Sequence, residues 1–316
     1  MGSVLECLPQ GSRIAVLRLR SLGDCVLTTP ALDILRRSRP DLRLSVVVED
    51  RFRPLFEDNP DLDDILPPSI GLLRQWRPRV CINLHGGSRS AWMTALSGAE
   101  YRTGFGHFRH RWVYNAHIPR AQEILGVERT VHTAEHLASA MFWLGAPVGE
   151  IPRAKLVAPA SQEPDQGGRR GPGGPPHQAA VAVIHPVAAN LEKTWRADGF
   201  LAVAQRLEEL GMEPVFIGAA SDNLTPFGAF RTMVGAPLAQ IKTLLASASF
   251  FVGNDSGPAH MAAAFGLPVV VIFGDSNPAI WGPWRTASEV VTAPGGIAHV
   301  GISQVLDALA RLRVHV

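Results

Sequence analysis

The stretch from Phe250 to Gly274 constrains the fold of this chain more than any other. It begins with an apolar run, Phe250 to Val252, that suits a buried strand and leads into a glycine-rich polar turn. Pro258 stands where the first turn of a helix would fall, because its missing N–H costs nothing there. A short helix is predicted at Ala259 to Phe265, and a second apolar strand at Val269 to Phe273. The pattern therefore predicts a strand–turn–helix–strand unit of an α/β protein.

The turn in this unit directs free backbone N–H groups at one point beside the start of the helix. A helix N-terminus carries a partial positive charge, so that point suits a phosphate group. Asp255, Ser256 and His260 would place polar side chains around it. An ordinary alternative stays open, because Asp255 or Ser256 could simply cap the helix, as residues of these types commonly do.

Length and composition narrow the class of protein. A chain of 316 residues exceeds the usual single domain, and 46% hydrophobic residues are enough for sizeable cores. The 30 Lys and Arg residues nearly balance the 28 Asp and Glu residues, which does not favour a nucleic-acid binder. Three widely spaced cysteines form neither a metal motif nor a disulfide framework, so a cytoplasmic location is expected. We find no apolar run of the ~20 residues that span a bilayer, and no secretory signal.

Strands alternate with helices in both halves of the chain, which predicts two parallel-sheet domains. We expect an N-terminal domain at residues 1–150, in which a helix at Cys25 to Arg37 must be kinked or begun by Pro30. Residues 151–178 are rich in glycine and proline and predict a linker or surface loop. The alternation restarts in a C-terminal domain at residues 179–316.

Five different groups of residues follow one another along most of the chain. They are Arg18 to Leu32; Asn83 to Ser90 with Tyr101 to Phe105; His185-Pro186 with Lys193 to Trp195; Gly253 to His260; and Phe273-Gly274 with Gly282 to Trp284. Together they resemble the motifs of glycosyltransferase family 9, the heptosyltransferases of lipopolysaccharide assembly. Each group alone is only moderately specific, and their order and spacing carry the resemblance.

The resemblance implies a GT-B fold, in which two Rossmann-like parallel-sheet domains face a cleft. It implies that the N-terminal domain binds the acceptor, that the C-terminal domain binds a nucleotide-sugar donor, and that transfer is inverting and needs neither metal nor cofactor. The implied donor is ADP-heptose, and the implied acceptor is an anionic glycolipid or glycan of the lipopolysaccharide core. The implied location is the cytoplasm, with room for peripheral contact at the inner membrane face.

Two positions depart from the family pattern. The third strand often carries aspartate where this chain has Asn83. After Ile217-Gly218 the family often places a glutamate that holds the ribose of the donor, whereas here the run is Ala219 to Asp222. Asp222 could replace that glutamate with a shorter reach.

Glycosyl transfer needs a base for the acceptor hydroxyl and positive partners for the departing pyrophosphate. Asp24 is the candidate base, because it follows the first strand at the edge where open α/β sheets place their sites. A helix cap is its alternative role. Lys193 is the candidate phosphate cation, and a solvated surface lysine is its alternative. The chain contains only three lysines, which makes an incidental one less expected.

Donor contacts are assigned to the C-terminal motif. Ser256, Gly257 and the N–H groups after them would bind the diphosphate. Asp255 could bind the donor sugar or brace the turn. His260 could face the phosphate, or it could be a core histidine bonded to a backbone carbonyl.

Arg102, Arg109 and Arg111 are the candidate acceptor residues. Arginine forks suit phosphate and carboxylate groups, and the aromatic residues among them could pack on sugar rings or a lipid surface. A solvated loop with its aromatic residues turned inward is the alternative.

Two other functions are alternatives to sugar transfer. The first is a nicotinamide-dependent oxidoreductase, which is disfavoured because no G-x-G-x-x-G follows the first strand. The second is a non-catalytic nucleotide-sugar-binding protein, which would have no need of both Asp24 and Lys193. No cluster of histidine, cysteine and acidic residues has the spacing of metal ligands.

Overall fold

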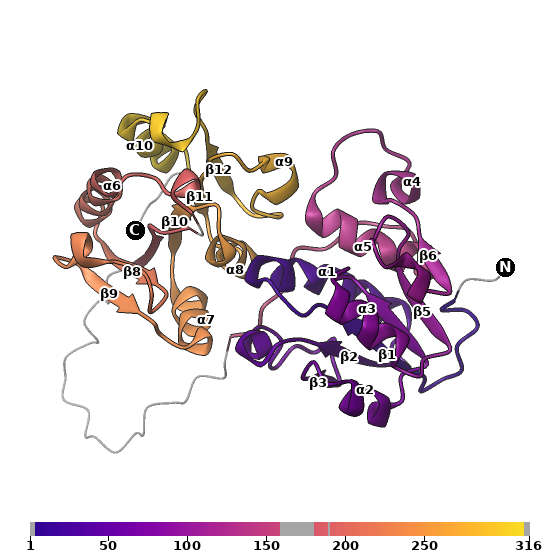
Figure 1. Cartoon of the computed structure of the whole chain (residues 1–316). Coiled ribbons are helices and arrows are strands. Elements are labelled where there is room, and N and C mark those ends of the chain that lie inside the picture. Colours follow the sequence, from indigo (N-terminus) through magenta and orange to yellow (C-terminus); the bar gives the residue numbers. More distant parts are fainter. Residues whose placement is uncertain (1–3, 159–179, 189, 313–316) are drawn as a thin grey trace, which may run out of the picture. The chain divides into compact units, whose positions relative to one another are not determined.

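The computed structural model describes residues 4–158, 180–188 and 190–312 (Figure 1). The chain forms two compact units. The first comprises Met1–Leu156 with Asn277–Thr286, and the second comprises Val157–Ser276 with Ala287–Val316. Most of the predicted linker, residues 151–178, lies outside the described residues.

The first unit is built on a six-stranded sheet within the described residues, and all its strands are parallel. Its strand order is β3-β2-β1-β4-β5-β6. The strands are β1 (Arg13–Leu17), β2 (Arg43–Val47), β3 (Asp64–Leu66), β4 (Val80–Asn83), β5 (Tyr101–Phe105) and β6 (Ala116–Ile118).

Helices cover both faces of this sheet (Figure 1). They are α1 (Leu22–Ser38), α2 (Ile70–Trp76), α3 (Ser88–Ala95), α4 (Ala121–Leu125) and α5 (Thr133–Leu144), with 3₁₀ turns η1 (Asp50–Leu55) and η2 (Arg111–Val113). Alternate strand residues point to opposite faces. Ala15 and Leu17 therefore pack with Leu73 of α2 and Met93 of α3 in one buried cluster.

Helix α1 passes through Pro30 without ending. A proline inside a helix leaves the carbonyl four residues earlier without its N–H partner. Here that carbonyl belongs to Val26, and the hydroxyl of Thr29 donates to it at 2.8 Å. The sequence predicted a kink or a helix start at Pro30. The helix begins at Leu22, so the alternative of a start at Pro30 is wrong, and the hydroxyl of Thr29 supplies the missing donor inside the helix.

The second unit repeats the architecture. Its six-stranded parallel sheet has the order β12-β11-β10-β7-β8-β9 within the described residues. The strands are β7 (Ala180–His185), β8 (Met212–Gly218), β9 (Arg231–Val234), β10 (Phe250–Asn254), β11 (Val269–Ile272) and β12 (Ser288–Val291). The helices and 3₁₀ turns are η3 (Leu191–Lys193), α6 (Ala197–Glu209), η4 (Thr225–Phe227), α7 (Leu238–Ser247), α8 (Gly257–Phe265), η5 (Ile297–His299) and α10 (Ile302–Arg311).

Both sheets follow the same winding. From its first strand, the chain adds two strands on one side and then three on the other, which is the Rossmann order. The order reverses between β1 and β4 in the first unit and between β7 and β10 in the second. Open α/β sheets bind ligands at the carboxyl ends of the strands beside such a reversal. The fold therefore marks one candidate position in each unit.

One short segment belongs to the first unit although it lies between strands of the second. Asn277–Thr286 includes helix α9 (Pro278–Trp281) and packs against the first unit. His132 and Gly282 share a hydrogen bond of 2.8 Å, and the ring of Trp284 stacks on His132 and donates to the carbonyl of Pro152. The sequence boundaries, at residues 150 and 178, did not anticipate this return of the chain.

Candidate active site

Asp24 lies in the first turn of α1, just beyond the carboxyl end of β1. Its carboxylate accepts a hydrogen bond of 3.0 Å from the hydroxyl of Ser21 and lies 3.5 Å from Nη1 of Arg18. The Arg18 side chain is buried, and that burial lowers its pKa. Ser21 occupies the N-cap position of the helix. Asp24 is therefore free of the capping role that was its alternative, and its carboxylate sits at the reversal of the first sheet.

Asn83 ends β4 and organises the turn beside Asp24. Its buried side-chain oxygen accepts the backbone N–H groups of His85 and Gly86, each at 3.0 Å. Its amide nitrogen donates to the hydroxyl of Tyr114 at 3.0 Å. This pairing uses the amide as both donor and acceptor, which gives a physical reason for asparagine at a position where aspartate was expected.

His85 stands in that turn, next to the Asp24 turn on the neighbouring strand. Burial lowers the pKa of its ring, and the positive charges of Arg18 and Arg20 lower it further, against the opposing effect of Asp24. Its Nδ1 atom is buried and has no hydrogen-bond partner among the described residues. A neutral imidazole therefore lies beside the candidate base.

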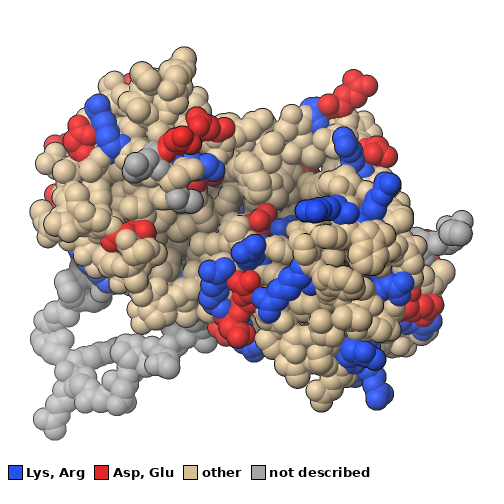
Figure 2. Space-filling view, viewed as in Figure 1, with Lys and Arg blue, Asp and Glu red and all other residues tan. Residues whose placement is uncertain are grey.

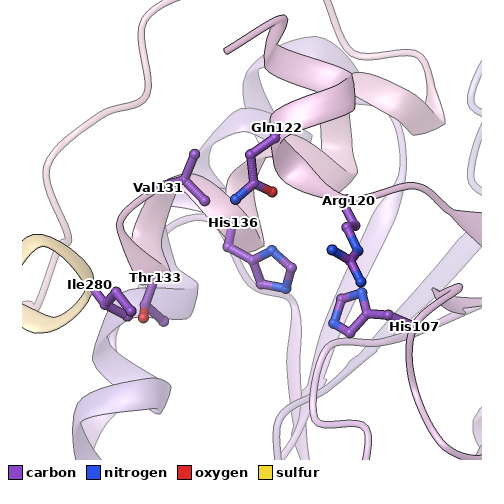
Figure 3. Close-up of a pocket in the computed structure, with 7 residues that line it drawn as sticks. All are labelled: His107, Arg120, Gln122, Val131, Thr133, His136 and Ile280. Carbon is purple, nitrogen blue, oxygen red and sulfur yellow. The ribbon is translucent and has the colours of Figure 1, made fainter. Parts of the chain in front are cut away.

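A pocket of about 290 Å³ opens at the carboxyl ends of β5 and β6 (Figure 3). His136 lies at its centre, stacked on Phe105 with ring centroids 4.0 Å apart, and burial lowers the pKa of His136 to about 4. Figure 3 shows Arg120 beside His107 on one side and Thr133 opposite. The lining residues are His107, Arg120, Gln122, Val131, Thr133, His136 and Ile280. A second pocket, of about 360 Å³, shares His107 and Arg120 and adds Arg111.

The three predicted acceptor arginines are placed differently. The guanidinium of Arg102 donates to the backbone carbonyls of Val113 and Ala99, so it braces the loop. Arg109 and Arg111 are exposed, and no carboxylate of the described residues lies within ion-pair distance of either. Arg111 lines the second pocket. Contact with an acceptor stays a prediction for all three.

In the second unit, Lys193 approaches Asp255 at the carboxyl end of β10. Its Nζ atom lies 3.6 Å from a carboxylate oxygen of Asp255, whose side chain is almost fully buried. The loop that carries Lys193 is fixed by Asn254, which accepts the backbone N–H of Trp195 at 3.0 Å. Gly274 packs against the same loop, at the backbone of Glu192. Lys193 is thus held at the reversal of the second sheet.

The start of α8 lies at the same edge. Ser256 is the N-cap residue, but no side chain caps the helix. The hydroxyl of Ser256 is instead 2.9 Å from Nδ1 of His185, the last residue of β7. Burial lowers the pKa of His185 to about 4, so this partner is neutral. The amides from Gly257 onward are therefore not occupied by a capping side chain, unlike in the ordinary cap that was the alternative reading.

The remaining donor residues lie nearby in the second unit. Asp222 follows β8, and one of its oxygens accepts the N–H of Ala219 at 2.7 Å. Its negative charge opposes the lowering of the His185 pKa. His260 is buried in α8, with only 5% of its surface exposed, which suits the core-histidine alternative. A donor contact stays a prediction for both residues.

No group of three or more histidine, cysteine or acidic side chains is arranged to hold a metal ion in the part of the chain that the structure describes. No helix among the same residues is both long enough and apolar enough to cross a membrane.

The family model of glycosyltransferase family 9 (heptosyltransferase) matches residues 72–299. The chain belongs to glycosyltransferase family 9. It is an enzyme that transfers sugars, on a fold of two Rossmann-like units of the GT-B type. The resemblance predicted from the motifs is confirmed, as is the predicted fold class.

Individual relatives of this family 9 glycosyltransferase are distant in sequence. It is 24% identical to lipopolysaccharide heptosyltransferase 3 of Escherichia coli K12 over 304 residues, which cover 84% of this chain and 83% of the relative. A glycosyl transferase family 9 structure from Veillonella parvula matches with a TM-score of 0.80 and 22% identity, covering 95% of this chain and 97% of that one. The E. coli ADP-heptose lps heptosyltransferase II matches with a TM-score of 0.75 and 20% identity, covering 95% and 98%.

Several candidate residues of this glycosyltransferase were missed from the sequence. Arg120 and His136 are separated from Arg109 in the chain and meet His107 only through the packing of α5 on the sheet. His185 was quoted as part of a motif, but its bond to Ser256 joins two strand ends that only the strand order makes neighbours. Assuming the Rossmann strand order would have placed His185 and Ser256 next to each other.

Proposed function

We propose that this glycosyltransferase moves heptose from ADP-heptose to a sugar of the lipopolysaccharide core, with inversion at the anomeric carbon and without a metal ion. One observation carries the proposal. Asp24 in the first unit, and Lys193 with Asp255 in the second, lie at the reversals of their sheets, where Rossmann-like units bind ligands. The names of the relatives, lipopolysaccharide heptosyltransferase 3 and ADP-heptose lps heptosyltransferase II, support the sugar, the nucleotide and the acceptor.

The second unit is proposed to bind the donor. The N-terminal amides of α8 and the ammonium of Lys193 offer positive partners to the diphosphate. Asp222 stands after the strand next to β7, where a Rossmann unit holds a ribose hydroxyl with a carboxylate. Asp255 keeps Lys193 near the diphosphate in the absence of a metal, because their charges attract at 3.6 Å.

The first unit is proposed to bind the acceptor and to supply the base. The acceptor oxygen forms a bond to the anomeric carbon as the bond from that carbon to the phosphate oxygen breaks. The hydroxyl proton passes to Asp24, and ADP leaves with the electron pair. Ser21 and Arg18 hold the Asp24 carboxylate in place during the transfer.

Anionic groups of the acceptor are proposed to bind beside His107. Arg109, Arg111 and Arg120 are exposed there, and none of them has an acidic partner within ion-pair distance among the described residues. Arg111 and Arg120 line the second pocket, and guanidinium groups at such a site suit the carboxylates and phosphates of a core oligosaccharide. We place the enzyme in the cytoplasm, in peripheral contact with the membrane that carries such an acceptor.

The direct test uses purified full-length protein, ADP-heptose and a delipidated core oligosaccharide. Release of ADP that depends on the acceptor, with a product one heptose heavier, supports the proposal. The anomeric configuration, read by NMR, tests inversion, and an unchanged rate in excess EDTA tests independence from metal. Release of ADP without any glycosylated product, or clear preference for a uridine-linked sugar, would contradict it.

A further inference from the structure

Two tryptophan side chains stand in water on the first unit. Trp92 is 53% exposed and Trp112 is 65% exposed, and their rings meet edge to face with centroids 5.6 Å apart. Among the large apolar side chains that the described residues expose, these two are the only aromatic ones. Exposed apolar groups that gather in one place commonly mark a surface with a partner.

The helix geometry explains why these rings point outward. On α3, Ala91, Met93 and Thr94 are buried, so the opposite side of the helix carries Trp92. Leu96, four residues later, lies on the same side and is also exposed, at 44%. Val113 anchors η2 in the buried cluster with Ala91, which brings Trp112 up beside Trp92. We call Trp92, Leu96 and Trp112 the tryptophan surface.

Positive charge surrounds the tryptophan surface. Arg89 lies three residues before Trp92 on the exposed side of α3, with one guanidinium nitrogen 3.8 Å from a carboxylate oxygen of Glu49, and Arg109 and Arg111 precede Trp112. From Tyr101 to Gln122 the sequence contains no acidic residue. Figure 2 shows an uncharged area over α3 bordered by lysine and arginine side chains, with few acidic ones among them.

The surface lies at the functional edge of the unit. Helix α3 starts directly after the turn at the end of β4, and η2 follows the end of β5. These strand ends belong to the edge at which Asp24 follows β1. A ligand held at this surface would therefore be close to the proposed acceptor pocket.

We propose that the tryptophan surface docks this enzyme on a lipid bilayer with anionic head groups. Tryptophan rings favour the head-group level of a bilayer, and arginine side chains near them are attracted to lipid phosphates. A stable protein partner would cover some 20 to 30 residues of this chain, whereas three apolar side chains with a cationic border form a much smaller anchor. The inference rests on the proposed function, because a lipid-linked acceptor gives the docking its purpose.

The test measures sedimentation of the purified full chain with vesicles of phosphatidylcholine alone or mixed with phosphatidylglycerol. Binding to the mixed vesicles, weakened by salt, is expected for the native protein. The pair Trp92→Ser and Trp112→Ser should lower the partition coefficient roughly tenfold or more. Val148→Ser, which removes a side chain of the same unit that is 74% exposed, should leave it unchanged. Native protein that ignores anionic vesicles, or equal losses in the control, would overturn the proposal.

Two further measurements keep the outcome clear. Transfer to the delipidated acceptor should be the same for the double variant and the native protein, whereas transfer to an acceptor embedded in vesicles should fall. Failure of both reactions in the native protein would count against the proposed function and not against lipid docking. If native protein is a dimer that the double variant splits, and vesicles are not bound, the surface joins two copies and the proposal is wrong. If the double variant melts below the native protein, Trp112→Ser alone, at a side chain that is 65% exposed, replaces it in every assay.

Discussion

The environment of Asp24 combines one cation with one hydroxyl donor. Arg18 is almost completely removed from water, and its charge is balanced chiefly by Asp24 at 3.5 Å. Burying a charged arginine costs free energy unless a carboxylate lies nearby, so Arg18 and Asp24 hold each other in place. This dependence fixes the carboxylate at the strand end before any substrate arrives.

Replacing Asp24 by asparagine should lower the rate of transfer by roughly 10²–10⁴-fold, because the amide cannot take up the hydroxyl proton. The KM for the nucleotide sugar should stay unchanged, since the donor is proposed to bind the other unit. Steady-state kinetics with each substrate varied would measure both effects. Ser21→Ala, which removes only the hydrogen bond at 3.0 Å, should cost less than about tenfold. Near-normal turnover of the asparagine variant would exclude Asp24 as the base.

Lys193→Ala should weaken ADP binding by roughly tenfold or more, because a charged partner of the diphosphate is lost and Asp255 is left without its cation. Adding Asp255→Asn to this variant should restore part of the affinity, since it removes a negative charge that would repel phosphate. Titration calorimetry with ADP measures both. Lys193→Arg should rescue only in part, because a planar guanidinium does not occupy the place of an ammonium. An unchanged affinity in Lys193→Ala would put this residue outside the donor site.

At the level of elements, two loops that carry the candidate groups are fixed by close backbone packing. The loop of Lys193 lies against Gly274, and the turn of His85 packs Gly86 against the ring of Phe108. Gly86 also has a φ of +74°, a conformation that glycine adopts without strain. Each glycine therefore positions a neighbouring functional loop.

Gly274→Ala should disturb donor binding without touching a donor residue. A methyl group at this position would collide with the backbone carbonyl of Glu192 and push away the turn that carries Lys193. The KM for the donor should rise several-fold, and the melting temperature should fall. Gly228→Ala is a matched control in the same unit, because its methyl group would be 3.4 Å from the nearest atom, the carbonyl oxygen of Thr225. Equal effects of the two substitutions would mean that Gly274 matters only for general stability.

Buried elements were predicted from the sequence more accurately than exposed ones. Strands inside the sheets, such as β10 and β11, are continuous apolar runs, and they were found at or near their predicted positions. The edge strands β3 and β9 were missed, because they are short and their residues are partly or fully exposed. Helix α1 begins three residues earlier than predicted, at Leu22, and it continues through Pro30, where the hydroxyl of Thr29 donates to the carbonyl of Val26.

The candidate site was predictable only where it follows a strand end in a local motif. Asp24, Lys193 and Asp255 were named from such motifs, and they lie at the sheet reversals. Arg120 and His136 come from separate elements that tertiary packing joins, and no local pattern in the sequence connects them.

At the scale of the whole molecule, five histidines of the described residues have a pKa that is lowered mainly by burial. They are His85, His107, His132, His136 and His185. For His136 in the first unit and His185 in the second, the lowered value is about 4. In the unfolded chain a histidine titrates near 6.5, so the unfolded state binds more protons between these two values.

The free energy of unfolding should therefore fall as the pH drops from about 6.5 towards 4. Each of the two histidines contributes on the order of 2 kcal/mol to the loss between pH 6.5 and pH 5. Urea denaturation at a series of pH values measures the slope. His136→Gln should flatten it for the first unit and His185→Gln for the second, if both variants fold. A free energy that is constant over this range would show that these rings are not kept neutral by the fold.

The return of Asn277–Thr286 to the first unit means that the chain passes between the units three times, not once. If related enzymes exchanged halves at the linker near residue 156, the first unit of one enzyme would receive Asn277–Thr286 from the other. The incoming segment would have to supply the counterparts of Gly282 and Trp284 to the host's His132. Recombination of donor and acceptor specificities in this family is thus constrained by ten residues that travel with one half and fold with the other.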